Sequence, residues 1–129
     1  MASLFTKMIN GEIPCHTIHE DGQFLSFLDI RPINPGHALV IPKKEVDYIF
    51  DVDDALLGGM MVFAKKVARA IEQEVDCRRV GMMVAGLEVP HAHIHLVPIR
   101  AIADLNFANA KPAESGDLAA LAQKIRARM

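Results

Sequence analysis

The amino-acid sequence predicts an α+β fold in which a five-stranded antiparallel sheet is joined by one long helix and shorter helices near the two ends. Five short segments have the apolar, β-branched composition of strands, a hairpin signal joins the first two, and the one long helical period falls between the third and fourth. We expect residues 1–129 to form a single domain, because this length is near the commonest size for one hydrophobic core.

The first elements follow from local spacing. Apolar residues recur at helical spacing over 4–9 and stop at Asn10-Gly11, which predicts a short helix closed by glycine. Residues 14–20 are rich in β-branched side chains and lead to Asp21-Gly22, a hairpin dipeptide. We therefore expect 14–20 and 24–28 to pair as antiparallel strands.

The middle of the chain contains the long helix. Two prolines and a glycine make 31–36 a loop, and the apolar run 37–41, closed by Pro42, predicts a strand that is buried on both faces. From 53 to 74 the apolar residues keep the helical period, with Asp53 or Asp51 available to cap the first turn.

Two further strands are expected at 79–85 and 92–99, the second with Pro98 as an internal stop signal. After Ala101 the sequence turns polar and small until apolar residues between 118 and 125 indicate a last helix. No glycine-rich phosphate loop follows the first strand, which argues against a Rossmann fold.

Composition narrows the class of partner. With 51% apolar residues and a formal charge of −2, the chain is globular and has no broad basic field for a nucleic acid polymer. No apolar run is long enough to span a membrane, and no secretory signal is visible at the start. Two cysteines without a CxxC spacing fit a reducing compartment, so we expect a cytoplasmic protein whose partner is a small molecule.

Three of the six histidines, His91, His93 and His95, occupy every second position of one short segment. If this segment is a strand, the three imidazoles line one face at intervals of about 6.6–7 Å, with Ile94 and Leu96 facing the core. Three interpretations are open: structural histidines, a zinc site with His37 as a further ligand, or a nucleophile with supporting groups. We favour the nucleophile.

The segment 91–97 resembles the signature of the histidine-triad (HIT) family, His-x-His-x-His followed by apolar residues. The stretch PGHALVIPKK at 35–44 and the motifs of residues 4–30 are similar, in order and spacing, to the adenosine phosphoramidase-like branch, which includes proteins like the protein kinase C interacting protein. The resemblance covers about 4–99 and leaves 100–129 as a C-terminal extension. It implies a HIT-like fold.

The resemblance also implies an activity. Family members hydrolyse or transfer nucleotides through a nucleotidyl-histidine, and the attacking residue here is His93, held by a backbone carbonyl near His91. His95 then contacts the phosphoryl oxygens or the leaving group, while His91 and His37 support the cluster. The expected substrates are nucleoside 5′-phosphoramidates or related conjugates.

The ligand implied by the resemblance is a purine nucleotide such as AMP or GMP. Asp29 is expected to accept hydrogen bonds from the ribose hydroxyls, since carboxylate oxygens only accept. The base is expected between apolar walls made by Phe5, Met8, Ile13, Phe27, Leu28 and Ile30. Family members are usually homodimers, and apolar residues on several sides of the long helix, at Met60, Met61, Phe63 and Val67, fit a subunit contact.

Two features depart from the family pattern. Before the triad, Leu87 replaces the usual glutamine and Glu88 brings a carboxylate toward the nucleotide phosphate. This leaves a nucleotide-binding regulatory module with little turnover as the alternative function. Some bacterial relatives hold a structural zinc through a CxxC at the first helix, but Ser3 and Thr6 occupy those positions here, so we expect no metal and no cofactor.

Overall fold

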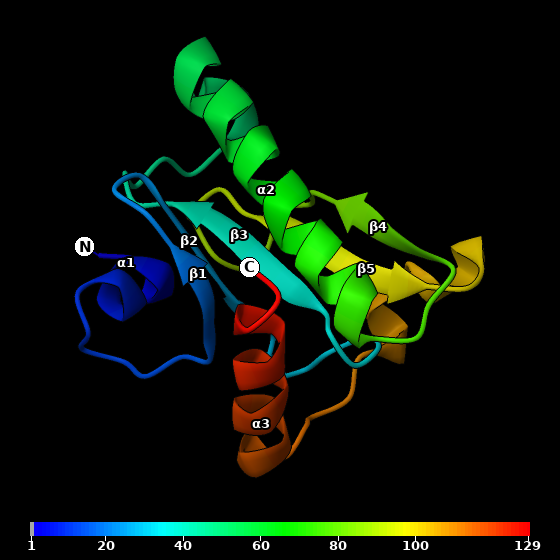
Figure 1. Cartoon of the computed structure of the whole chain (residues 1–129). Helices are drawn as coiled ribbons and strands as arrows, with labels where there is room; N and C mark the ends of the chain where they lie inside the picture. The colour runs from blue at the N-terminus through cyan, green and yellow to red at the C-terminus, as the bar shows by residue number, and fades with distance from the viewer. Residues whose placement is uncertain (1) are drawn as a thin grey trace.

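The computed structural model describes residues 2–129 and has the predicted α+β architecture (Figure 1). The strands form one antiparallel sheet in the order β1-β2-β3-β5-β4. Three single turns of 3-10 helix lie at Ile49–Asp51, Ile102–Asp104 and Phe107–Asn109. The main elements are α1 (Leu4–Ile9), β1 (Thr17–Glu20), β2 (Phe24–Leu28), β3 (Ala38–Pro42), α2 (Asp54–Glu74), β4 (Arg79–Met83), β5 (Ile94–Ile99) and α3 (Ser115–Arg126).

Helix ends form where the sequence supplies capping groups. The Ser3 hydroxyl accepts a hydrogen bond from the Thr6 amide at 3.0 Å and caps α1. The Asp53 carboxylate accepts from the Leu56 amide at 2.9 Å and caps α2. Gly11, with φ of +78°, lets the chain turn away after α1, a conformation that suits glycine.

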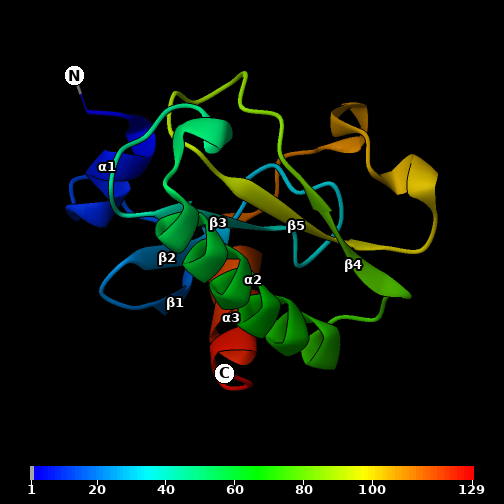
Figure 2. The ribbon, with the colours of Figure 1, turned by 90° about the horizontal axis from the view of Figure 1, so that it is seen from above.

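The two faces of the sheet are covered by different helices (Figure 2). The long helix α2 and the C-terminal helix α3 pack on one face, where Leu118, Ala122 and Ile125 of α3 join the main apolar core. The smaller helix α1 covers part of the other face, where Phe5 meets a second apolar cluster containing Phe27. The extension after residue 100 thus contributes buried side chains to the main core.

Strands β1, β4 and β5 are shorter than predicted, whereas β2 has the predicted bounds. Strand β1 starts at Thr17 and β4 ends at Met83, whereas strands were expected from 14 and to 85. The fifth strand was expected over 92–99 and occupies Ile94–Ile99, so it ends where predicted, and the internal Pro98 does not interrupt it. Pairing with β3 ends at Leu96, so the Pro98 ring lies where no ladder bond is needed on that side, and its carbonyl accepts from the Asn34 side chain at 2.8 Å.

Helix α2 uses most of its apolar residues within the subunit. Met60, Phe63 and Val67 were expected to be available to a second subunit, but they are buried in the chain's own core. Of the four predicted contact residues only Met61 is exposed. Among the described residues, no helix combines the length and apolar character that a bilayer crossing requires.

Candidate active site

A row of three side chains across the central strands forms the floor of a pocket on the α1 face of the sheet. Phe27 on β2 is paired with Leu39 on β3, and Leu39 is paired with His95 on β5. Residues on either side of His95 belong to the main core, so the His95 ring lies on the opposite face, which is the face of α1. The register of the sheet therefore places a histidine beside two apolar side chains.

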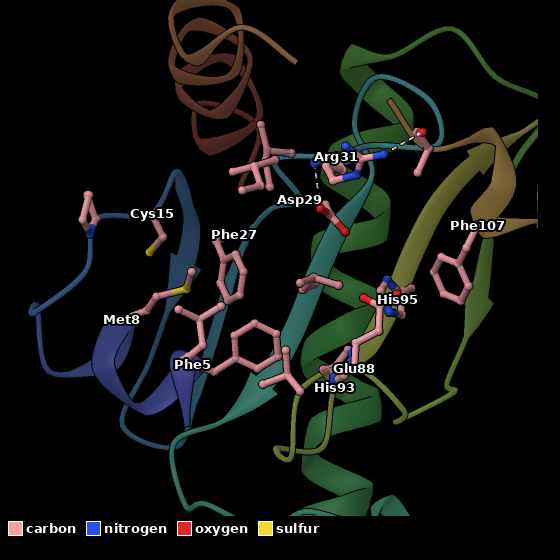
Figure 3. Close-up of a pocket in the computed structure, with 17 residues that line it drawn as sticks. Phe5, Met8, Cys15, Phe27, Asp29, Arg31, Glu88, His93, His95 and Phe107 are labelled. Carbon is pink, nitrogen blue, oxygen red and sulfur yellow. Dashed lines mark hydrogen bonds between the residues drawn. The ribbon is translucent and has the colours of Figure 1, made fainter. Parts of the chain in front are cut away.

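The pocket has a volume of about 400 Å³ and opens between α1, β2 and the segments before and after β5 (Figure 3). Nine predicted residues line it, whereas Ile13 does not, and His37 and His91 lie outside its wall. The predicted lining residues are Phe5, Met8, Phe27, Leu28, Asp29, Ile30, Glu88, His93 and His95. The lining residues that were not predicted are Leu4, Pro14, Cys15, Arg31, Leu39, Val89, Phe107 and Ala110.

The three histidines are not aligned along one strand, as the alternating pattern had suggested. Only His95 lies within β5, which begins at Ile94, and His91 and His93 belong to the irregular segment before it. The rings of His93 and His95 are neighbours, with centroids 4.9 Å apart. The His91 ring turns away toward α1 and the end of β3, because its nitrogens find their partners there.

His93 is oriented by the backbone of His91. Its Nδ1 donates to the His91 carbonyl oxygen at 2.7 Å. In the imidazole form the lone pair is then on Nε2, and this atom has no hydrogen-bond partner among residues 2–129. Phe5 packs edge-on against the ring, with centroids 5.1 Å apart, and fixes its plane.

His95 is oriented by a second chain of hydrogen bonds. The Ile33 amide donates to Nδ1 of His37 at 3.0 Å, so the proton of a neutral His37 is on Nε2. That proton is donated to Nδ1 of His95 at 2.9 Å, which leaves the His95 proton on Nε2. The two pocket histidines therefore differ: His93 has a free lone pair on Nε2, and His95 has an N–H there.

Burial keeps the rings of His95 and His37 uncharged. It is the main reason that the pKa of His95 is lowered to about 3, and positive charge on His37 or His93 would lower it further. Burial also lowers the pKa of His37, although the Asp29 carboxylate opposes the shift. The hydrogen-bond chain through His37 and His95 requires both rings to be neutral, so the lowered pKa values agree with the geometry.

The side chains of Asp29, His37 and His95 offer ligand atoms within 4.8 Å of one another. A divalent metal needs a nitrogen lone pair from each imidazole. His37 has none free, because Nδ1 accepts the Ile33 amide and Nε2 holds the proton given to His95. The existing hydrogen bonds thus compete directly with a metal at this cluster.

Asp29 follows β2 and faces both the pocket and the histidines. One carboxylate oxygen accepts from the Arg31 amide at 2.9 Å, and the other lies 3.6 Å from Nε2 of His37. The Arg31 side chain reaches the Ala110 carbonyl at 3.5 Å (Figure 3). Asp29 is therefore held by a local turn while it still lines the cavity.

Phe107 is the main pocket residue that the sequence analysis missed. It lies on a 3-10 turn of the C-terminal extension and contacts the His95 ring edge-on, with centroids 4.9 Å apart. The surrounding residues are small and polar without a regular period, so the only available signal was one aromatic residue within a polar stretch.

Comparison with known proteins finds relatives of the histidine-triad type over most of the chain. A family model described as the HIT domain matches residues 10–102. An uncharacterized HIT-like protein from Methanocaldococcus jannaschii is 37% identical over 99 residues, which cover 74% of this chain and 77% of that protein. Adenosine 5′-monophosphoramidase hnt1 from Schizosaccharomyces pombe is 35% identical over 99 residues, covering 76% and 74% of the two chains.

Solved structures agree in fold. A HIT-like protein from Bartonella henselae, described as involved in cell-cycle regulation and solved with an unknown ligand, superposes with a TM-score of 0.87 at 30% identity. The match covers 98% of this chain and 96% of that one, so it includes the C-terminal extension. The HIT-domain model matches more than half of the chain, and the solved HIT-like structure has the same fold. This chain therefore belongs to the HIT family.

Proposed function

We propose that this protein hydrolyses nucleoside 5′-phosphoramidates or related nucleotide conjugates, with purine nucleotides preferred, through a nucleotidyl-histidine at His93. The observation that carries the proposal is the orientation of the His93 ring. Its Nδ1 is held at 2.7 Å from the His91 carbonyl and its Nε2 is left without a partner among the described residues, at the wall of a pocket of about 400 Å³. The similarity to a named adenosine 5′-monophosphoramidase supports the reaction class.

The first step is an attack on the α-phosphorus. The Nε2 lone pair of His93 forms a P–N bond, and the bond from phosphorus to the substrate nitrogen breaks. That nitrogen leaves as an amine, carrying the electron pair of the broken bond and a proton taken from solvent. The N–H on Nε2 of His95 donates to a phosphoryl oxygen and stabilises the charge there.

The second step restores the enzyme. Water adds to the phosphorus, the P–Nε2 bond breaks, and its electron pair returns to His93. One proton of the water passes to solvent, and the nucleotide leaves with the new hydroxyl. His37 takes no direct part, and we assign it the role of keeping the proton of His95 on the pocket side.

The nucleoside half has matching surfaces. Phe5, Met8 and Phe27 supply an apolar wall for a base, and this wall lies on the α1 side of the pocket (Figure 3). Asp29 lines the neighbouring end with a carboxylate that is able to accept from a ribose diol. We therefore assign the base to the α1 side and the ribose to Asp29.

One observation favours the alternative of a nucleotide-binding module with little turnover. Glu88 lines the pocket, so its carboxylate is near the site of a nucleotide phosphate, and like charges repel. Leu87 beside it is 92% exposed and contributes no polar group to the pocket.

The decisive experiment measures AMP release from adenosine 5′-phosphoramidate together with AMP affinity. Wild-type release that is lost in His93→Ala, with affinity retained, supports the hydrolase. A matched control is His16→Ala, since His16 lies outside the pocket and its replacement should leave release unchanged. AMP binding without release from the wild-type protein would reject the hydrolase in favour of the binding module.

We also propose that the protein forms a homodimer through one side of the sheet and α2. Strand β4 is an edge strand, and its Met82 and the following Val84 are exposed, as are Met61 and Val62 on α2. Exposed apolar side chains at an open strand edge favour a second chain. A monomer in sedimentation experiments would overturn this assignment.

A further inference from the structure

We propose that Ser3, Thr6 and Glu45 are positioning residues for His93, because together they hold the His91 residue from which the His93 ring takes its orientation. The inference rests on the proposed function where it concerns turnover, while its geometric part stands independently. None of the three side chains lines the pocket.

The network begins at the His91 ring, which is fully buried. Its Nε2 lies 2.7 Å from the Pro42 carbonyl oxygen, which only accepts, so the proton is on Nε2. Its Nδ1 therefore accepts, and the Ser3 hydroxyl donates to it at 2.8 Å. Burial lowers the pKa of His91, which favours this neutral form. Ser3 is 6% exposed, so this hydrogen bond is shielded from competing water.

The second half of the network anchors Ser3 itself. Glu45, in the loop after β3, accepts from the Ser3 amide at 2.6 Å and from the Thr6 hydroxyl at 2.7 Å. These two bonds, the amide first, lower the pKa of Glu45 to about 2, so it is a carboxylate throughout the neutral range. The start of α1 is therefore tied to the loop after β3 by one charged acceptor.

These contacts bring together three segments that are distant in sequence. The Val46 carbonyl, next to Glu45, accepts from the Ala92 amide at 2.7 Å, so the loop is bonded directly to the residue after the His91 carbonyl and, through Ser3, to the His91 ring. That carbonyl is the acceptor for Nδ1 of His93. A shift of the start of α1 or of the loop thus moves the acceptor that orients the attacking ring.

Ser3 is suited to this position because it has two roles at once. Its oxygen accepts from the Thr6 amide as the cap of α1, and its proton goes to His91. Ser3→Ala removes both interactions, whereas Ser3→Thr keeps both. Thr6 is a second hydroxyl near the same nitrogen, at 3.4 Å, so the Ser3→Ala/Thr6→Val double variant removes the substitute donor as well.

The experiment measures kcat and KM for adenosine 5′-phosphoramidate. Ser3→Ala and the double variant should lower kcat by about 10- to 100-fold, the scale of a misplaced reacting group, with KM changed less than about twofold. Ser3→Thr should restore kcat. The matched control is Asp53→Ala, which removes the equivalent cap of α2, and its kcat should stay at the wild-type value.

Glu45 is tested against its neighbour Asp47, an exposed carboxylate in the same loop. Glu45→Ala should lower kcat with little effect on KM, and Asp47→Ala should change neither. Equal kcat values for each variant and its control would overturn the inference, as would a loss of activity that comes entirely from KM.

Nitrogen NMR of the histidine rings separates this inference from the proposed function. In the wild type we expect the proton of His93 on Nδ1 and that of His91 on Nε2, and in Ser3→Ala a loss of this single pattern at His93. If the wild type releases no AMP, the hydrolase proposal fails while the ring spectra still decide the positioning role. Identical His93 spectra in wild type and the double variant would reject it.

Discussion

The two faces of the sheet are built from different kinds of side chain. The face under α2 and α3 is an apolar core whose large members, such as Met60 and Ile71, are fully buried. The opposite face carries a smaller apolar cluster beside four buried histidines. Burying an imidazole costs free energy unless its nitrogens are hydrogen-bonded, and here backbone groups and neighbouring side chains supply most of those bonds. The face under α2 and α3 supplies stability through buried apolar side chains. The opposite face has fewer buried apolar side chains and instead holds histidine rings in fixed orientations.

The largest expected effect on stability lies on the apolar face. Ile125 of α3 is completely buried in the main core, so Ile125→Ala should lower the free energy of unfolding by about 2–5 kcal/mol. Denaturant unfolding measures this, with Lys124→Ala, an exposed change on the same helix, as the control. Turnover per folded molecule should not change. An effect as small as that of the control would mean that α3 is not part of the cooperative fold.

The histidine face should make the protein sensitive to acid. The unfolded chain protonates a histidine near pH 6.5 and the folded chain protonates His95 near pH 3, so between these values the unfolded state binds more protons. Stability therefore falls as the pH falls through this window, by on the order of 3 kcal/mol between pH 6.5 and about 4 for His95 alone. His37 and His91 act in the same direction.

Unfolding experiments across this pH range test the acid prediction. His95→Asn should flatten the dependence of the unfolding free energy on pH. His16→Asn, a histidine outside the cluster, should leave the dependence as it is in the wild type. An equal slope in all three proteins would contradict the assignment of the acid response to the buried cluster.

Phe107 should have a smaller effect that is confined to the pocket. Its ring is 37% exposed and contacts His95, so Phe107→Ala should change kcat/KM by about 2- to 10-fold, the value of one aromatic contact, with little loss of stability. Phe50→Ala removes an aromatic ring that is 77% exposed and does not line the pocket, and it serves as the control. If both variants match the wild type in kcat/KM, Phe107 is only a surface residue.

The smallest predicted effect concerns the pocket rim. Removing the negative charge with Glu88→Ser should raise phosphoramidate turnover by a few-fold, since exposed charge interactions are worth about 1 kcal/mol or less. Glu12→Ser makes the same charge change away from the pocket and should have no effect. An unchanged or lower rate in Glu88→Ser would count against repulsion at this position.

The parts of the molecule that depend on local patterns were predictable from the sequence. The Asn10-Gly11 and Asp21-Gly22 signals and the period of the long helix identified the fold, and the alternating histidines pointed to His93 and His95 in the pocket. The resemblance to a known family supplied the assignment of Phe5 and Asp29 to the pocket, which no local pattern contains.

What the sequence did not predict depends on contacts between distant segments. The His91 ring leaves the face of the triad because Pro42 and Ser3, far away in the chain, provide its partners. Phe107 reaches the pocket because the extension returns to β5. The sequence of the extension has no apolar periodicity that would predict this contact. Pro98 remains within a strand because its neighbour β3 has already ended, which is a property of the register and not of the residue.

The row of Phe27, Leu39 and His95 separates the part of the pocket that stays rigid from the part that is able to change. These residues lie on hydrogen-bonded central strands, the elements that open last in a folded protein, so the floor holds its shape while ligands come and go. The walls come from α1, the segment before β5 and the extension after it, which lie outside the hydrogen-bonded sheet. New substrate preferences can therefore arise through changes in the walls, without disturbing the rigid floor that carries His95.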